Sequence, residues 1–332
     1  MNRSKKPLLI LASLGVLAVC VLLSLALGSR PVGIADVLGA LRDGARADFT
    51  ALVVRERIPR TIFSLIAGAS LGVSGLLMQA ITRNPIADPS ILGVNMGASL
   101  FVVAGIAFWG IGAMGEYILL ALLGAALTAA FVYAIASMGA GGATPIKLAL
   151  AGSATSAALS SLVSALVLPR TSVMNTFRFW QIGSVSGATW EAIAATLPFL
   201  AIGVVFGFLL APALNAMALG DDVAVGLGVR TGLVRTLGAL TGVVLCGAIT
   251  ALAGPIGFIG LMVPHAARLI LGQDMRLTLP VSAIAGAALL TLADVAGRLL
   301  GRPGELEVGI VTAFLGGPIL IYIAKKARMR AL

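Results

Sequence analysis

The stretch that decides the fold of this chain runs from Arg57 to Gly97 and reads RIPRTIFSLIAGASLGVSGLLMQAITRNPIADPSILGVNMG. Its middle part, Thr61–Thr82, is apolar and glycine-rich, and it has the roughly 20 residues that a helix needs to cross about 30 Å of hydrocarbon. An R-x-P-R string precedes this part, and the string NPIADP follows it. Because a residue before proline is pushed out of helical geometry, the second string predicts a tight turn. The stretch therefore predicts a membrane span between two arginines and a rigid turn.

The composition places the whole chain among membrane proteins. Of its 332 residues, 59% are hydrophobic and only 11% are charged, whereas soluble domains carry about 25% charged residues. We therefore expect an all-α membrane protein with about ten transmembrane helices in a single domain over residues 1–332. The candidate spans are Leu8–Gly28, Thr61–Thr82, Ile91–Trp109, Tyr117–Met138, Leu148–Leu168, Ala192–Leu214, Thr236–Ala253, Gly254–Leu271, Leu277–Ala293 and Val308–Ala324.

Basic residues at both termini set the expected topology. Arg3, Lys5 and Lys6 precede the first span, and Lys325–Arg330 follows the last one. Since flanking Lys and Arg favour the cytoplasm, both termini are expected there, which requires an even number of spans. The segment Gly254–Leu271, which glycines and prolines interrupt, is therefore counted as a short irregular span. The net charge of +10 reflects this topology and not nucleic-acid binding, for which the sequence shows no motif.

The chain lacks the signatures of an ATPase and of a metal or catalytic centre. It contains no G-x-x-x-x-G-K-[ST] loop for phosphates, a single histidine (His265), and two cysteines (Cys20 and Cys246) that both fall within predicted spans. We therefore expect no nucleotide site, no cofactor and no disulfide in this chain. The same absences disfavour a membrane-embedded enzyme, which would need clustered histidines, cysteines or acids.

Asp294 is the one carboxylate that falls beside the core of a predicted span. Arg298 follows four residues later, so a helix would place the two side chains on one face as an ion pair. A proton-coupled secondary transporter that uses Asp294 as its relay is the alternative from another functional class. The high cost of an unpaired charge in lipid favours the structural ion pair.

Several strings carry a resemblance to a known family. They are NPIADP at Asn84–Pro89, LGDDVAVGLGV at Leu219–Val229 and GPIGFIGLMVPH at Gly254–His265. In these strings the chain resembles the permease family of iron–siderophore, haem and vitamin B12 ABC importers, the FecCD type. Two further strings, FRFWQIGSVSG at Phe177–Gly187 and NMGASL at Asn95–Leu100, look most like those of the ferric siderophore permeases.

The resemblance implies a type II ABC importer permease fold in the bacterial cytoplasmic (inner) membrane. It implies a dimer of permease subunits, formed with a second copy or a paralogue, with two cytoplasmic ABC ATPases and an extracytoplasmic substrate-binding protein. The cargo is then a ferric siderophore or a related metal chelate, which enters by ATP-driven alternating access. The chain itself is not catalytic. A haem or cobalamin permease is the alternative within this class.

Arg57, Arg60 and Arg298 match the arginines with which such permeases meet glutamates of the binding protein. From the residues alone, the R-x-P-R pair is read as an interfacial anchor, with Pro59 in the first turn of a helix. The resemblance favours docking and implies that the three arginines face outward.

Two cytoplasmic loops match the gates of the family. Asn84 and Ile86 match gate positions in the proline-rich turn, and the loop Gly142–Lys147 matches a second gate through Thr144 and Pro145. Pro145 departs from the family pattern. The reading from the residues alone is a tight loop in which Asp88 caps the next helix.

The largest cytoplasmic loop, Asn215–Arg235, predicts two short amphipathic helices broken at Gly226–Gly228, with Asp221 or Asp222 capping the first. One reading is a loop on the membrane surface, and the other is a coupling element held in a groove of an ATPase. The resemblance favours the coupling element and assigns to it Leu219, Gly220, Asp221, Ala224, Gly226, Leu227 and Gly228.

The span Leu148–Leu168 is rich in hydroxyl side chains, among them Ser153, Ser156, Ser160 and Ser164. Small and hydroxyl residues allow close helix packing, and they also suit a weakly polar passage. The resemblance places these serines on the translocation path between two permease subunits. In the outer loop that follows, Trp180 and Trp190 are expected at the membrane interface.

Overall fold

The computed structural model describes residues 5–28, 31–42, 49–111, 114–139 and 144–329, and every regular element in these ranges is a helix. The expected all-α class is therefore confirmed. The elements are α1 (Lys5–Ala26), α2 (Ile34–Arg42), α3 (Phe49–Thr82), η1 (Pro89–Leu92), α4 (Val94–Ala104), η2 (Gly105–Trp109), α5 (Met114–Ser137), α6 (Pro145–Val167), α7 (Thr171–Ile182), α8 (Trp190–Ala218), α9 (Asp221–Gly226), α10 (Thr231–Ala253), α11 (Ile259–Leu271), α12 (Met275–Leu300) and α13 (Val308–Met329).

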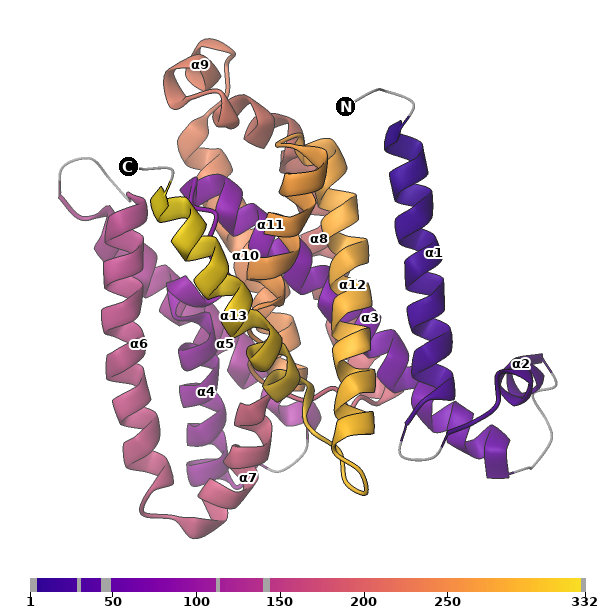
Figure 1. The fold of residues 1–332 in the computed structure, drawn as a ribbon. Coiled ribbons are helices and arrows are strands. Elements are labelled where there is room, and N and C mark those ends of the chain that lie inside the picture. The colour runs from indigo at the N-terminus through magenta and orange to yellow at the C-terminus, as the bar shows by residue number, and fades with distance from the viewer. Residues whose placement is uncertain (1–4, 29–30, 43–48, 112–113, 140–143, 330–332) are drawn as a thin grey trace.

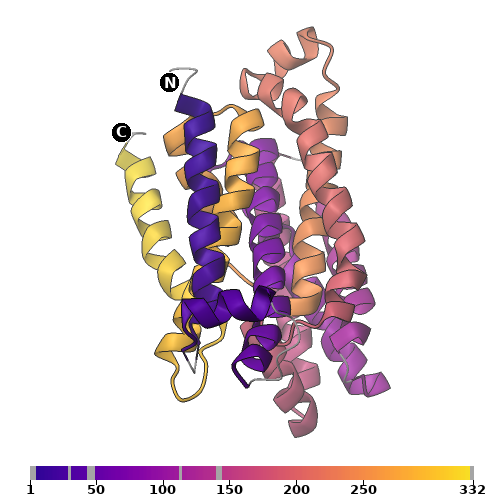
Figure 2. The ribbon, with the colours of Figure 1, turned by 90° about the vertical axis from the view of Figure 1, so that its right-hand side faces the viewer.

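Each of the ten predicted spans has a helical counterpart. Seven helices are long and apolar enough to cross a membrane, namely α1, α3, α5, α6, α8, α10 and α12. Three shorter apolar stretches, Val94–Trp109, Ile259–Leu271 and Val308–Tyr322, account for the remaining spans. The start of α1, the end of α13 and the short helix α9 lie at one end of the bundle (Figures 1 and 2). Arg3 and Arg330 are two of the basic residues from which cytoplasmic termini were expected, and both lie outside the described residues.

Two of the spans are irregular. The third begins as the 3-10 helix η1, breaks at Gly93 with φ of 73°, continues as α4 and ends in the π-helix η2. A Cβ atom at Gly93 would also crowd the side chain of Thr128, so glycine suits this break in two respects. The segment before α11 is non-helical from Gly254 to Phe258, as the glycines and prolines there predict.

Two short helices were not expected from the sequence. Helix α2 lies beside the end of α1, and α7 lies in the predicted outer loop between α6 and α8. Trp180 of α7 is 8% exposed, and its ring stacks on Phe177 with the ring centroids 5.8 Å apart. The expected interfacial position of Trp180 is therefore wrong, because α7 turns this face of its helix inward. Trp190 is 56% exposed, which suits the expected interfacial position.

Helix α3 is the centre of the bundle and crosses it diagonally (Figure 1). It packs against α12 and α11 through glycines, with backbone against backbone. A Cβ atom at Gly68 would overlap the carbonyl of Gly286, and one at Gly75 would overlap the carbonyl of Gly260. In lipid, helices associate through this kind of close van der Waals packing, because no hydrophobic effect drives them together.

Helix α3 is longer than the predicted span, and this corrects the expected position of the R-x-P-R pair. The helix begins at Phe49, so Pro59 lies inside it and not in its first turn. Arg57 and Arg60 are therefore carried on a helix face. Their orientation is set by helical geometry, whereas the expected position before the span would have left them free to turn outward.

The close packing of α3 at its glycines can be tested by adding one methyl group. Gly75→Ala places a Cβ atom against the Gly260 backbone, which cannot rotate away, so we expect a loss of stability of about 1–3 kcal/mol. The measurement is the thermal unfolding midpoint of the purified protein in detergent. Gly232→Ala in the first turn of α10 is the control, because nothing lies within 4 Å of its added Cβ. Equal midpoints for the two variants would contradict the proposed packing.

Candidate functional site

Arg60 joins two carboxylates at the end of the bundle opposite α9. Its Nε and Nη2 donate to Asp294 Oδ1 at 3.0 and 2.6 Å, and its Nη1 contacts Glu305 Oε2 at 2.6 Å. The Asp294 side chain is 1% exposed and that of Glu305 is 34% exposed. The guanidinium thus links a buried carboxylate on α12 to a partly exposed one in the loop between α12 and α13.

Arg298 completes this cluster from the inside. Its Nη2 lies 3.0 Å from Asp294 Oδ2, which confirms the predicted i,i+4 ion pair. Its Nη1 donates to the carbonyls of Ser24 and Leu27 at 2.9 and 3.0 Å, and its Nη2 donates to Ser24 Oγ at 2.8 Å. The side chain is 2% exposed.

Arg57 is buried at the same place, and its Nη1 donates to the carbonyls of Leu25 and Ala26 at 2.8 and 3.1 Å. These carbonyls belong to the last turn of α1, where helix geometry leaves carbonyls without intrahelical partners. Arginines near a helix C-terminus also interact favourably with its dipole. Arg57 and Arg298 therefore anchor the end of α1 to α3 and α12.

The expectation that all three arginines face outward is consequently wrong for Arg57 and Arg298. The unpaired carbonyls of α1 and the carboxylate of Asp294 draw both side chains into the bundle, where an uncompensated charge would be costly. Arg60 is the most accessible of the three, with 13% of its side chain exposed.

The turn after α3 is held by its own side chains. Asn84 Oδ1 accepts a hydrogen bond from the Ile86 amide at 3.1 Å, and the Asn84 carbonyl accepts one from the Ala87 amide at 3.1 Å. Asp88 accepts from the Ser90 amide at 3.0 Å and caps η1, as predicted. Ile86 is 40% exposed. The predicted tight turn is thus present, with one apolar side chain projecting from it.

The second candidate gate is described only in part. Thr144 caps α6, and its Oγ1 accepts a hydrogen bond from the Lys147 amide at 3.4 Å. Pro145 is the first residue of α6, a position that suits its missing N–H. Gly142 and Ala143 of this loop lie outside the described residues.

The loop Asn215–Arg235 corrects two expectations and leaves others in place. It holds one short helix, α9, and not two, because residues 231–235 form the start of the long helix α10. Helix α9 ends at Gly226, and Gly228 follows with φ of 81°, so the predicted break is present. The N-cap of α9 is Gly220, and neither Asp221 nor Asp222 caps the helix. Asp221 instead pairs with Arg83 and Arg235 at 2.6 and 2.7 Å. Two nearby guanidinium groups outcompete the backbone amides for this carboxylate.

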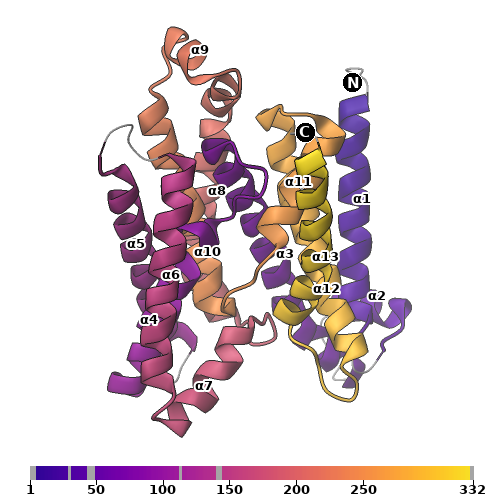
Figure 3. The same ribbon diagram turned by 60° about the vertical axis from the view of Figure 1, so that its left-hand side comes forward.

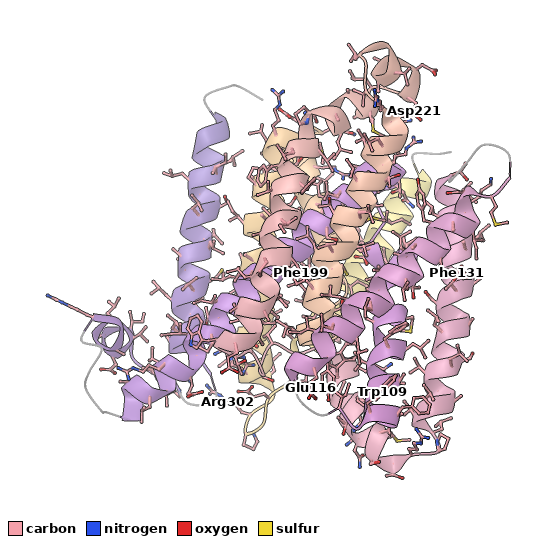
Figure 4. All side chains as sticks on the ribbon, turned by 180° about the vertical axis from the view of Figure 1, so that it is seen from behind. Trp109, Glu116, Phe131, Phe199, Asp221 and Arg302 are labelled. Carbon is pink, nitrogen blue, oxygen red and sulfur yellow. The ribbon has the colours of Figure 1, made fainter. Side chains whose placement is uncertain are left out.

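The surface of α9 is apolar on its outer side. Ala224 is fully buried, whereas Leu219 and Leu227 are 69% and 65% exposed. Val223 and Val225 are also exposed. Asp221 and this surface lie at the opposite end of the molecule from Arg302, whose loop also carries Glu305 (Figure 4). An exposed apolar patch of this kind is typical of a contact with another protein or with the membrane surface.

Helix α6 packs on α4 and α5 at the edge of the bundle, and only 11% of its apolar stretch is buried. Ser153, Ser160 and Ser164 are exposed along one helix face, because their spacings of seven and four residues return to the same side. Ser156 is less exposed and lies on the side facing Gly93. Figure 3 shows α6 and α13 in front of the other helices.

Several site residues could not be found from the sequence. Glu305, Ser24 and Arg83 pair with residues 245, 274 and 138 positions away. Of these three residues, only Arg83 could have been suspected from the sequence, since it directly precedes the predicted turn. Among the residues that the structure describes, no group of three or more His, Cys, Asp or Glu side chains is placed to hold a metal ion.

Comparisons with known proteins agree along most of the chain. The model of the FecCD transport family matches residues 16–326. The ferric enterobactin transport system permease protein FepD of Escherichia coli (strain K12) is 40% identical over 94% of this chain and 93% of its own length. The Fe(3+)-citrate import system permease protein YfmD of Bacillus subtilis (strain 168) is 41% identical over 92% of this chain and 91% of its own.

A solved structure also has this fold. It is described as a metal-chelate type ABC transporter in an inward-facing conformation, and it superposes with a TM-score of 0.84 at 25% identity. The match covers 97% of this chain and 99% of the solved chain. The expected permease fold is therefore confirmed over nearly the whole length.

The charge cluster predicts unequal roles for its two carboxylates. Asp294→Asn leaves the buried Arg298 without a counter-charge, so we expect a loss of about 3–5 kcal/mol in the free energy of unfolding. Glu305→Gln removes a partly exposed partner and should cost about 1 kcal/mol or less. Chemical unfolding of both purified variants measures the difference. Similar small losses in both variants would argue against a structural role for Asp294.

Proposed function

We propose, from the fact that this chain belongs to the FecCD transport family, that it is the membrane-spanning permease subunit of an ABC importer for a ferric siderophore or related iron chelate. The observation that carries the substrate class is the pair of relatives named for ferric enterobactin and Fe(3+)-citrate, each aligned over more than nine-tenths of this chain. The chain resides in the cytoplasmic membrane and acts as a transport permease.

ATP hydrolysis is assigned to a separate subunit. The sequence has no phosphate-binding loop, and the permease moves its cargo without covalent chemistry. The exposed apolar surface of α9, formed by Leu219, Val223, Val225 and Leu227, supports α9 as the helix that seats in the ATPase. In this proposal α9 lies on the cytoplasmic side, together with the start of α1 and the end of α13, which are at the same end of the bundle.

The cargo path is assigned to the junction between two permease subunits. A bulky chelate needs a wide passage, and the exposed faces of α6 and α13 offer walls that a second subunit would complete. The serines Ser153, Ser160 and Ser164 provide a weakly polar lining on α6, and Phe314 of α13 is 82% exposed. The turn with Asn84 and Ile86, together with Thr144 and Pro145, would close the path at the cytoplasmic end.

Docking of the binding protein is assigned to the opposite end, with Arg60 as its accessible cation. Glu305 forms an ion pair with Arg60 in the free permease, so a carboxylate of the binding protein must displace Glu305. Arg57 and Arg298 would contribute without direct contact, since their buried positive charges raise the electrostatic potential around Arg60. Electrostatic attraction of this kind acts on the association rate and depends on salt.

Transport itself provides the test of the proposed function. Proteoliposomes that hold the permease with its co-purified ATPase and binding protein should take up ferric enterobactin or ferric citrate only when ATP is supplied on the α9 side. Leu227→Asp should abolish both ATPase association and uptake, because it places a charge in an apolar contact. Ile34→Asp makes the same change at an exposed site on α2 and should leave both intact.

Three outcomes of this experiment would refute the assignment. They are uptake driven by a proton gradient without ATP, ATP hydrolysis by the purified chain alone, and preferential uptake of cobalamin over both iron chelates. The first would support the secondary-transporter alternative, and the last would support a cobalamin permease.

If the binding protein docks at Arg60, substitutions of Arg60 and of Glu305 should have opposite effects on its affinity. Arg60→Gln should weaken binding of the binding protein by about tenfold at low salt, whereas Glu305→Gln should strengthen it, because Arg60 is released. Glu307→Gln, which removes the same charge two residues away, is the control. Affinities are measured by titration of the binding protein onto permease in nanodiscs. Weaker binding by Glu305→Gln would show that Glu305 itself contacts the partner.

A further inference from the structure

Asp221 joins three segments that are distant in the sequence. Its Oδ1 lies 2.6 Å from Arg83 Nη2 at the end of α3, and its Oδ2 lies 2.7 Å from Arg235 Nη2 on α10. Arg83 Nη2 also donates to the carbonyl of Met217 in the last turn of α8 at 2.6 Å. Both carboxylate oxygens are thus engaged by arginines from different helices.

Arg83 occupies a special place in the chain, between α3 and the turn with Asn84 and Ile86. Its φ of 51° is in the left-handed region, which is uncommon for a residue with a side chain and costs on the order of 1 kcal/mol or more. The hydrogen bond to Met217 and the ion pair to Asp221 hold its side chain while the backbone adopts this conformation. A displacement of Asp221 therefore acts on the residue that starts the turn.

The turn is built to move as a unit. Pro85 and Pro89 restrict its backbone, and the Asn84 side chain ties the Ile86 amide to the turn. By contrast, α9 is flanked by Gly220 and Gly228, with φ of 122° and 81° and open space around both. Helix α9 can thus shift between two glycine joints, while the turn that it pulls on stays rigid.

We propose that Asp221, Arg83 and Arg235 form an ionic clasp that transmits movement of α9 to the turn Arg83–Asp88 and so opens or closes the cytoplasmic end of the path. This rests on the proposed function, in which α9 meets the ATPase and the turn is a gate. The clasp makes Asp221 and Arg83 positioning residues for transport, acting through the turn and without contact with the cargo.

The energetics of the clasp suit transmission better than stabilisation. The side chains of Asp221, Arg83 and Arg235 are 40%, 42% and 34% exposed. Ion pairs with this exposure contribute little to stability. Loss of one pair should leave the fold intact, whereas the mechanical link between α9 and the turn would be lost. The two roles can therefore be separated by experiment.

The experiment uses the full importer complex in proteoliposomes, with ferric enterobactin as the probe. We expect Asp221→Asn to retain the ATPase and its hydrolysis, while uptake per ATP falls by about fivefold or more. Asp221→Glu should retain uptake, because it keeps the charge. Asp36→Asn, which changes an exposed aspartate in the first turn of α2 at the opposite end of the bundle, is the control and should behave as wild type.

A second measurement reads the turn directly. Ile86→Cys should react with a water-soluble thiol reagent to different extents with and without ATP, and Asp221→Asn in the same chain should remove that difference. Arg83→Gln should also remove the ATP-dependent difference in labelling, because it breaks the same ion pair while leaving the sequence of α9 unchanged. The Arg83→Gln/Asp221→Asn double variant should lose less transport than the sum of the two single losses, because each single variant already removes the Arg83–Asp221 pair.

The outcomes separate this inference from the function on which it rests. If the wild-type complex takes up no iron chelate with ATP, the proposed function fails. If the wild type transports and Asp221→Asn transports equally well per ATP, the clasp is overturned. Loss of the ATPase from Asp221→Asn would also overturn it, because Asp221 would then be a direct ATPase contact. Additive losses in the double variant would show two independent roles.

Discussion

The close approach of α3 to α11 and α12 is the constraint on which the rest of the structure depends. Glycines at Gly68 and Gly75 bring the α3 backbone against Gly286 and Gly260, with no room for a side chain between them. The helix has 34 residues and is about 51 Å long, well beyond the roughly 30 Å of a hydrocarbon core. It therefore crosses at a tilt and reaches both surfaces. One tightly held helix thus positions Arg57 and Arg60 at one end and Arg83 at the other.

The two ends use charge in different ways because their burial differs. At the end opposite α9, Asp294 and Arg298 are almost fully buried, and each has several polar partners, so removal of one group would leave a costly charge. The arginines there also satisfy the last carbonyls of α1, which holds that helix to the bundle. At the α9 end Arg83, Asp221 and Arg235 are partly exposed. Such pairs add little stability but can direct movement, which suits a segment that must shift.

Under the proposed function the permease works by relative movement of surfaces, and the chain offers three surfaces for contact with its proposed partners. The apolar side of α9 suits an ATPase, the serine face of α6 and the exposed side of α13 suit a second permease, and Arg60 suits a carboxylate of a binding protein. The surfaces are connected through α3 and the turn that follows it.

The sequence by itself determined the membrane class, the ten spans, the break before α11, the rigid turn at Asn84–Pro89 and the pairing of Asp294 with Arg298. These features depend on apolar length, on proline and glycine chemistry, or on the i,i+4 spacing, all of which act between neighbouring residues. Only the tertiary structure decided that Arg57 faces the end of α1, that Arg60 holds Glu305, and that Asp221 bridges Arg83 and Arg235. Those partners are 14 to 245 positions apart, and they meet only because the helices that carry them pack together.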